Sequence, residues 1–253
     1  MLYIKTSYTY NYSKTPQRLL IVSSKVDEES SVSSNGAEKN GEDEIGRLFA
    51  SIISGDLAAV YVYKNNLSPF TKITGSPELK IKAALILFFI YSYKMGLAGN
   101  EPREQKALLK NLKKDLDKIF PGNGKAFYSG LDKLSGDILT LLNREKTLLD
   151  RQNLPNPNFA TRYEIEGLKT DKLALLKDIA KQLEEISKIA SGKKGNPKVK
   201  EIALKAIALR QAQQKHMRLN FEELNALVSN INPRTTDRDI HHMLSQTSIL
   251  KAL

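Results

Sequence analysis

Apolar residues recur at helical spacing over most of the chain after residue 44. The clearest run alternates steps of three and four residues, through Leu176, Ile179, Leu183, Ile186 and Ala190. This alternation places all five on one face of a helix that lies nearly parallel or antiparallel to a neighbour. We therefore expect Leu183 and Ile186, at the centre of the run, to be core residues.

Residues that start and stop helices divide the chain further. Ser76-Pro77-Glu78 predicts a helix start, because Ser accepts hydrogen bonds from free amides, Pro suits the first turn and Glu faces the positive end of the helix dipole. The helix after it, to about Leu97, is apolar on nearly all sides and should be buried. Other helices are expected near residues 45–54, 57–64, 102–120, 125–151, 176–190, 197–216 and 221–229, and after Thr236.

This pattern predicts an all-α fold, a multi-helix bundle of about seven to nine helices with helical hairpins and a short extended or disordered N-terminal segment. Within residues 1–44, residues 1–23 alternate loosely and predict one or two short strands. Residues 24–44 are polar, and seven acids against Lys39 give the part from Asp27 to Glu44 a net charge of −6. We interpret 24–44 as a disordered, dispensable linker; the alternative is a strap that folds back onto basic residues further along.

The positions of the expected helices and of the proline-containing segments predict the domain organisation. Residues 45–151 form a helical domain, and residues 152–165, which contain Pro155 and Pro157, form a linker. Residues 166–253 are expected to hold a helical hairpin and C-terminal helices with a basic surface.

Composition narrows the classes of protein. The chain has no cysteine, which excludes disulfides, thiolate metal sites and cysteine nucleophiles. The longest apolar run, Ala83 to Tyr91, is far shorter than the roughly 20 residues that a membrane-spanning helix needs. No signal peptide is visible near Met1. We expect a cytoplasmic protein, or one secreted into a host cell by a route without a cleaved signal peptide.

Positive charge is concentrated in one stretch. The formal net charge is +11, and residues 186–218 hold nine basic residues against Glu201, a local net charge of +8. A field of one sign attracts an anionic partner through charge rather than fold. The predicted anion-binding residues are Lys193, Lys194, Lys198, Lys200, Lys205 and Lys215. The alternative is that these lysines only keep a helical bundle soluble.

Two short glycine-lysine motifs can be compared with known phosphate-binding loops. Gly192-Lys193-Lys194-Gly195 has the bare form of the loop with which KH domains clamp a nucleic-acid backbone. A KH fold also needs a small sheet, which the surrounding sequence does not predict. Gly122-Asn123-Gly124-Lys125 fails the Walker pattern, because Ile119 and Ala126 stand where Gly and Ser or Thr are required.

The histidines offer a weak candidate for acid–base or metal chemistry. Asp237 and His241 are four residues apart and share a helix face, whereas His241 and His242 point about 100° apart. Two ligands without a third do not make a zinc site. We therefore predict no catalytic residue, no metal site and no cofactor, and no small-molecule ligand is identified.

The lack of cysteine, the many Lys, Asn, Leu and Ser residues, the helical hairpins and the tail Ser248-Ile249-Leu250-Lys251-Ala252-Leu253 together resemble secreted effector proteins of intracellular bacteria, such as the type IV secretion effectors of Legionella. Such effectors carry a C-terminal translocation tail with apolar residues near its end. The acidic cluster often found upstream is missing here, since only Asp237 and Asp239 lie nearby.

The sequence is compatible with three hypotheses for function. The leading prediction is a helical protein-interaction module, a secreted effector that docks on a host protein. The first alternative is an electrostatic binder of nucleic acid or an anionic membrane through residues 186–218. The second alternative is an enzyme whose site is not recognisable from sequence.

Overall fold

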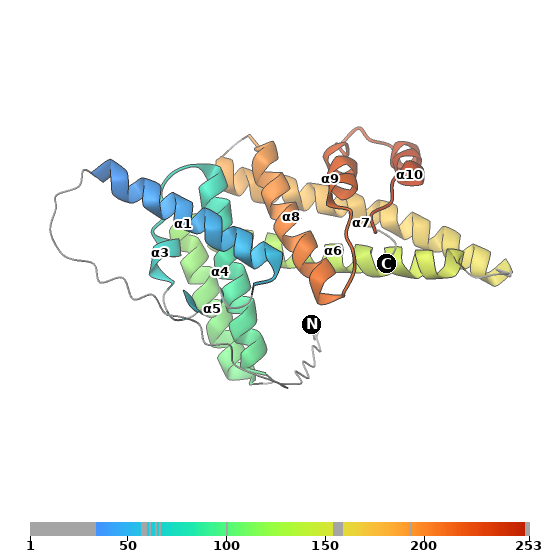
Figure 1. The fold of residues 1–253 in the computed structure, drawn as a ribbon. Helices are drawn as coiled ribbons and strands as arrows, with labels where there is room; N and C mark the ends of the chain where they lie inside the picture. The colour runs from blue at the N-terminus through green and yellow to red at the C-terminus, as the bar shows by residue number, and fades with distance from the viewer. Residues whose placement is uncertain are drawn as a thin grey trace. The chain divides into compact units, whose positions relative to one another are not determined.

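The computed structural model describes residues 34–250, with gaps at 57–59, 61, 64, 66, 100, 154–158 and 193, and leaves out the side chains of 34–41, 159, 160 and 162. The strands expected within residues 1–23 and most of the helix expected at 57–64 lie outside the described residues. The described part is all-α, with nine helices and no strand, which confirms the predicted fold class (Figure 1). Its β pairing is limited to an isolated bridge between Leu219 and Leu250.

Residues Glu42–Leu253 form one compact unit. Helices on both sides of the expected linker at 152–165 contribute to the same hydrophobic core, where the sequence analysis expected two helical parts. Helix α1 (Ser34–Ser54) begins earlier than the expected start near Ile45. The residues before Ile45 include Ala, Glu and Lys, which favour helix, and the helix buries Ile45, Leu48, Phe49 and Ile52 further along.

Helix α4 (Pro77–Leu97) is central, and it follows the short α3 (Ser68–Thr71). It begins as predicted, with the Ser76 side chain accepting a hydrogen bond from the Leu79 amide. Every residue from Ala83 to Tyr91 is buried, so the apolar sequence is explained by core packing. Neither α4 nor any other helix in the described part of the chain is long and apolar enough to cross a membrane.

A tight corner joins α5 (Pro102–Ile119) to α6 (Gly124–Gln152). The Gly124 amide donates to the Asp117 carboxylate at 3.1 Å. A Cβ atom at Gly124 would lie 2.6 Å from the Asp117 Cα and 2.7 Å from the Lys113 carbonyl oxygen, so only glycine fits. The rings of Phe120 and Phe127, on either side of the corner, have centroids 4.3 Å apart.

Helix α6 pairs with α7 (Phe159–Ser191) in a long hairpin. The predicted run from Leu176 to Ala190 is buried, with Leu183 2% exposed and Ile186 fully buried, as expected. Helix α7 already begins inside the predicted linker. At about 1.5 Å per residue, α7 is about 50 Å long, and the end that it shares with α6 extends past α10 in Figure 1.

Three helices complete the fold close to the expected ranges: α8 (Pro197–Gln214), α9 (Phe221–Ser229) and α10 (Asp237–Gln246). Asn196 caps α8, and Thr236 and Asp239 form a capping box at the start of α10. Helix α8 does not have a single buried face. It packs against α4, α6, α7 and α9, so it is buried on several sides.

The C-terminal tail is part of the fold through Leu250. Ile249 is fully buried and Leu250 is 6% exposed, and the Asn220 amide donates to the Ile249 carbonyl at 2.8 Å. Core packing therefore accounts for two of the apolar tail residues on which the resemblance to effectors rests. Residues 251–253 lie outside the described part.

Candidate functional site

The structure does not gather the five predicted anion-binding lysines that it describes into one patch. Lys198 and Lys205 are exposed and two turns apart on the same side of α8, while Lys200 lies on the opposite side. Lys215 is at the far end of a helix about 27 Å long. Lys194 is exposed in the turn before the helix, and Lys193 lies outside the described residues.

A carboxylate neutralises part of this basic region. Lys200 Nζ lies 2.6 Å and Lys188 Nζ 3.3 Å from the Glu184 carboxylate. The hydrogen bond from Lys200 is the main reason that the pKa of Glu184 is lowered, and the charges of Lys200 and Lys188 add to it. A single acid thus faces two of the nine basic residues counted in this stretch.

The Gly-Lys-Lys-Gly turn is built as a helix–helix connection. The Ser187 hydroxyl bonds both the amide and the carbonyl of Asn196, and the Asn196 side chain donates to Glu78 at 2.7 Å. A Cβ atom at Gly195 would lie 2.9 Å from a Glu184 carboxylate oxygen. The backbone of this turn therefore faces a carboxylate of the same protein, which is itself paired with two lysines.

The pKa of Glu78, beside the same turn, is also lowered. The largest cause is a hydrogen bond from its own backbone amide, and the next is the hydrogen bond from Asn196. Two ionised acids, Glu78 and Glu184, thus flank the turn that the sequence singled out for anion binding.

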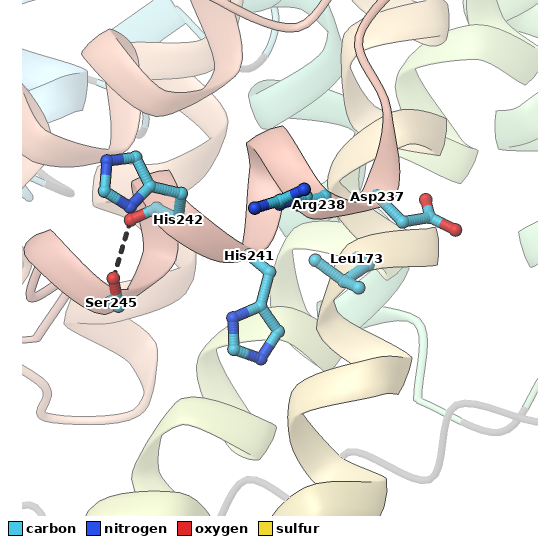
Figure 2. Close-up of a pocket in the computed structure, with 6 residues that line it drawn as sticks. All are labelled: Leu173, Asp237, Arg238, His241, His242 and Ser245. Atoms are coloured by element: carbon cyan, nitrogen blue, oxygen red, sulfur yellow. Dashed lines mark hydrogen bonds between the residues drawn. The ribbon is translucent and has the colours of Figure 1, made fainter.

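The histidine candidate borders an open hollow of about 560 Å³ between α7 and α10. Its lining residues, drawn in Figure 2, are Leu173, Asp237, Arg238, His241, His242 and Ser245. Asp237 is taken by an ion pair with Lys177, and His241 and His242 point to different sides of α10 (Figure 2). No group of three or more potential metal ligands occurs in the described ranges.

A second hollow, of about 330 Å³, lies beside α3 and α5. The Tyr91 hydroxyl donates to Asp115 at 2.7 Å, and Lys118 pairs with the other Asp115 oxygen at 2.7 Å. Burial, followed by this hydrogen bond, raises the pKa of Tyr91 far above its usual value. Tyr91 therefore stays protonated and serves as a donor that ties α4 to α5.

Helix α5 carries a basic face that the count of charge along the sequence does not reveal. At about 100° per residue, six cations fall within an arc of about 140°. They are Arg103, Lys106, Lys110, Lys113, Lys114 and Lys118. The buried residues Leu112, Leu116 and Ile119 occupy the opposite side. We call these six residues the α5 basic face.

Most of the α5 basic face is exposed and unpaired. Among the described residues, Lys118 is its one member in an ion pair, and Lys113 lies 4.9 Å from the centroid of the Tyr128 ring. Lys106, Lys110 and Lys114 follow one another at i,i+4, where each like-charge neighbour destabilises a helix by about 0.2–0.5 kcal/mol. The helical spacing of the six cations was visible in the sequence. A count of net charge does not reveal it, because Glu104, Asp115 and Asp117 lower the net charge of the same segment.

The far end of the α6–α7 hairpin has the opposite electrostatic character. We define the hairpin end as residues 144–152 and 161–172. Its charged side chains pair with one another, through Arg144–Asp171 at 2.7 Å, Lys146–Asp150 at 2.9 Å, Arg151–Glu164 at 3.2 Å and Lys169–Glu166 at 2.6 Å.

A buried ion pair closes the base of the hairpin end. Lys172 contacts Glu145 across the two helices, and their side chains are only 5% and 7% exposed. Further along the same interface, Gln182 donates to Asp137 at 2.6 Å. These two polar contacts pair Glu145 with Lys172 and Asp137 with Gln182, so together they fix the register of the hairpin.

One large apolar side chain is exposed at the hairpin end. Tyr163 is 77% exposed, whereas Leu148, on the facing helix, is buried outside the main core.

Comparison of the chain with protein-family models, with curated proteins and with solved structures finds no match.

Proposed function

We propose that this protein is a helical protein-interaction module that docks on a folded partner protein through the hairpin end. The observation that carries the proposal is that the hairpin extends past the rest of the unit with its register fixed and with an exposed aromatic residue, Tyr163. A rigid surface loses little conformational entropy when it binds, so more of its contact energy appears as affinity.

The charge balance of the hairpin end supports a protein partner. Since its described charges pair within the hairpin, it presents neither a strong positive nor a strong negative field. Tyrosine is enriched at the centres of protein interfaces, because its ring supplies apolar contact area and its hydroxyl can hydrogen-bond at the rim. The expected partner surface is therefore an apolar pocket with a polar edge that accepts the Tyr163 ring.

The origin of the partner belongs to the same proposal. The resemblance in composition and C-terminal tail to secreted effectors supports a host-cell protein as the partner. Translocation of a reporter fused to the full chain from a bacterium into cultured host cells tests this part on its own.

Site-specific crosslinking tests the docking surface. A photoreactive phenylalanine analogue placed at position 163 of the full chain should crosslink a defined protein, and Tyr163→Ala should abolish co-purification of that protein. The matched control places the same analogue at Glu222, an exposed position on α9. The proposal is wrong if both positions crosslink the same proteins, or if Tyr163→Ala leaves co-purification unchanged.

A further inference from the structure

The α5 basic face runs along most of its helix. From Arg103 to Lys118 it runs about 22 Å along the helix at about 1.5 Å per residue. All its residues lie on the side of α5 that faces away from the buried Leu112 and Leu116. Because they share one side of a rigid helix, they can meet one extended surface together.

We infer that the α5 basic face binds an anionic lipid membrane at its surface, independently of the protein-docking function proposed above. A bilayer rich in phosphatidylserine or phosphoinositide presents a plane of negative charge, and clusters of four to eight lysines or arginines on an amphipathic helix match it. The apolar side of α5 stays in the protein core, so the contact is peripheral and electrostatic.

The number of cations on one side, together with charge compensation elsewhere, favours α5. Lys198 and Lys205 are also exposed without an ion pair among the described residues, but they are only two on their side of α8. Lys200 and Lys188 face Glu184, and Lys172 is buried against Glu145. On α5, by contrast, Arg103, Lys106, Lys110 and Lys114 are exposed and make no ion pair within the described residues. The acid within the arc, Asp117, accepts a hydrogen bond from the Gly124 amide at one end of the helix.

The make-up of the face favours a membrane over nucleic acid. Five of the six cations are lysines, and the arc contains no aromatic ring to stack on a base and no amide side chain to read one. The other residues in the arc are Ala107 and Asp117. This surface offers charge without the groups that base recognition uses.

An exposed apolar residue lies where α4 ends, shortly before α5 begins. Leu97, the last residue of α4, is 63% exposed and stands five positions before Pro102, where α5 begins. Such a side chain can enter the boundary between headgroups and acyl chains, which strengthens peripheral binding. A nucleic-acid partner would leave it without a role.

Vesicle co-sedimentation of the full chain tests the inference. The probes are phosphatidylcholine vesicles with and without about 30 mol% phosphatidylserine, at about 50 mM and about 200 mM salt. We expect binding to the phosphatidylserine vesicles alone, weakened at the higher salt. Because each lysine near the surface contributes about 1 kcal/mol, Lys110→Gln with Lys114→Gln should lower the partition coefficient about 30-fold.

Matched variants separate the α5 basic face from net charge. Lys146→Gln with Lys169→Gln removes the same charge from ion-paired lysines of the hairpin end and should leave binding nearly unchanged. Leu97→Ser should weaken binding a few-fold. Circular dichroism of each variant shows that the fold is intact.

Four results would overturn the inference. They are no binding to phosphatidylserine vesicles at low salt, an equal loss in the hairpin control, a larger loss for Lys198→Gln with Lys205→Gln on α8, and tighter binding to a roughly 20-base-pair DNA duplex at the same phosphate concentration. The last result would assign the α5 basic face to nucleic acid instead.

Discussion

The α5 basic face and the hairpin end are both exposed, helical and rich in charge, but they differ in what their charges contact. On α5, Lys118 is in an ion pair and most of the other cations face solvent. At the hairpin end, ion pairs within and between the two helices account for the described charged side chains, apart from Glu145 and Lys172, which pair in the interior. The comparison teaches that the density of charged residues alone does not reveal an uncompensated field, because neighbouring side chains can pair the charges.

Breaking the buried pair of the hairpin should have the largest effect. Lys172→Met leaves the Glu145 carboxylate buried without a counter-charge, which should lower the free energy of unfolding by about 3–5 kcal/mol. Urea titration followed by circular dichroism measures this loss. Lys172→Met with Glu145→Leu should recover most of the stability, because no charge remains buried.

Lys169→Met is the exposed control for that experiment. Lys169 pairs with Glu166 at the surface, so its loss should cost at most about 0.5 kcal/mol. If Lys172→Met and Lys169→Met lower the free energy of unfolding equally, the buried pair stabilises the hairpin no more than an exposed pair does.

A charge reversal on α5 should have a smaller effect of opposite sign. Lys110→Glu turns two like-charge neighbours, Lys106 and Lys114, into i,i+4 attractions and should stabilise the protein by about 0.5–1 kcal/mol. Thermal or urea unfolding measures the change. The same variant should bind phosphatidylserine vesicles more weakly, so stability and binding move in opposite directions.

The corresponding reversal on the hairpin sharpens the contrast. Lys146→Glu places a like charge beside Asp150 and should destabilise by about 0.5 kcal/mol. If Lys110→Glu and Lys146→Glu change the free energy of unfolding in the same direction, the proposed difference between the uncompensated charges of α5 and the paired charges of the hairpin end is contradicted.

The smallest effect concerns pH. The pKa of Glu184 is lowered in the folded state, chiefly by the hydrogen bond from Lys200, so its contribution is present above the unfolded-state pKa of about 4.5 and is lost as pH falls through the lower folded value. Glu184→Gln should flatten the dependence of unfolding free energy on pH between about pH 5 and about pH 3, by less than about 1 kcal/mol because the pair is partly exposed. Lys110→Gln, which touches no carboxylate, should leave that dependence as in the parent chain, and an unchanged slope in Glu184→Gln would contradict the assignment.

Much of the fold is predictable because its signals are local. Ser76 and Pro77 mark the start of α4 through capping geometry alone, and the spacing from Leu176 to Ala190 identifies the buried side of α7. The surroundings of α8 are not local. Its burial on several sides depends on which helices lie around it, and a single periodic face in the sequence cannot specify four neighbours.

The candidate surfaces were harder to predict for a related reason. A count along the chain favours residues 186–218, where basic residues are frequent, but Glu184 lies outside that window and neutralises part of it in space. On α5 the acids lie in the same window as the cations, yet Glu104 lies outside the arc of the basic face and Asp115 pairs with Lys118 alone among its cations. The buried Lys172 was missed because its partner, Glu145, lies on another helix.

The corner between α5 and α6 offers a way to find relatives of this protein. Gly124 admits no side chain, Asp117 caps its amide, and Phe120 packs against Phe127. Together these contacts constrain an Asp, a Phe, a Gly and a second Phe at relative spacings of three, four and three residues. A distant descendant that keeps this turn must keep the glycine, so the spaced pattern, combined with an apolar helix before it and a long hairpin after it, can trace ancestry after overall sequence similarity has been lost.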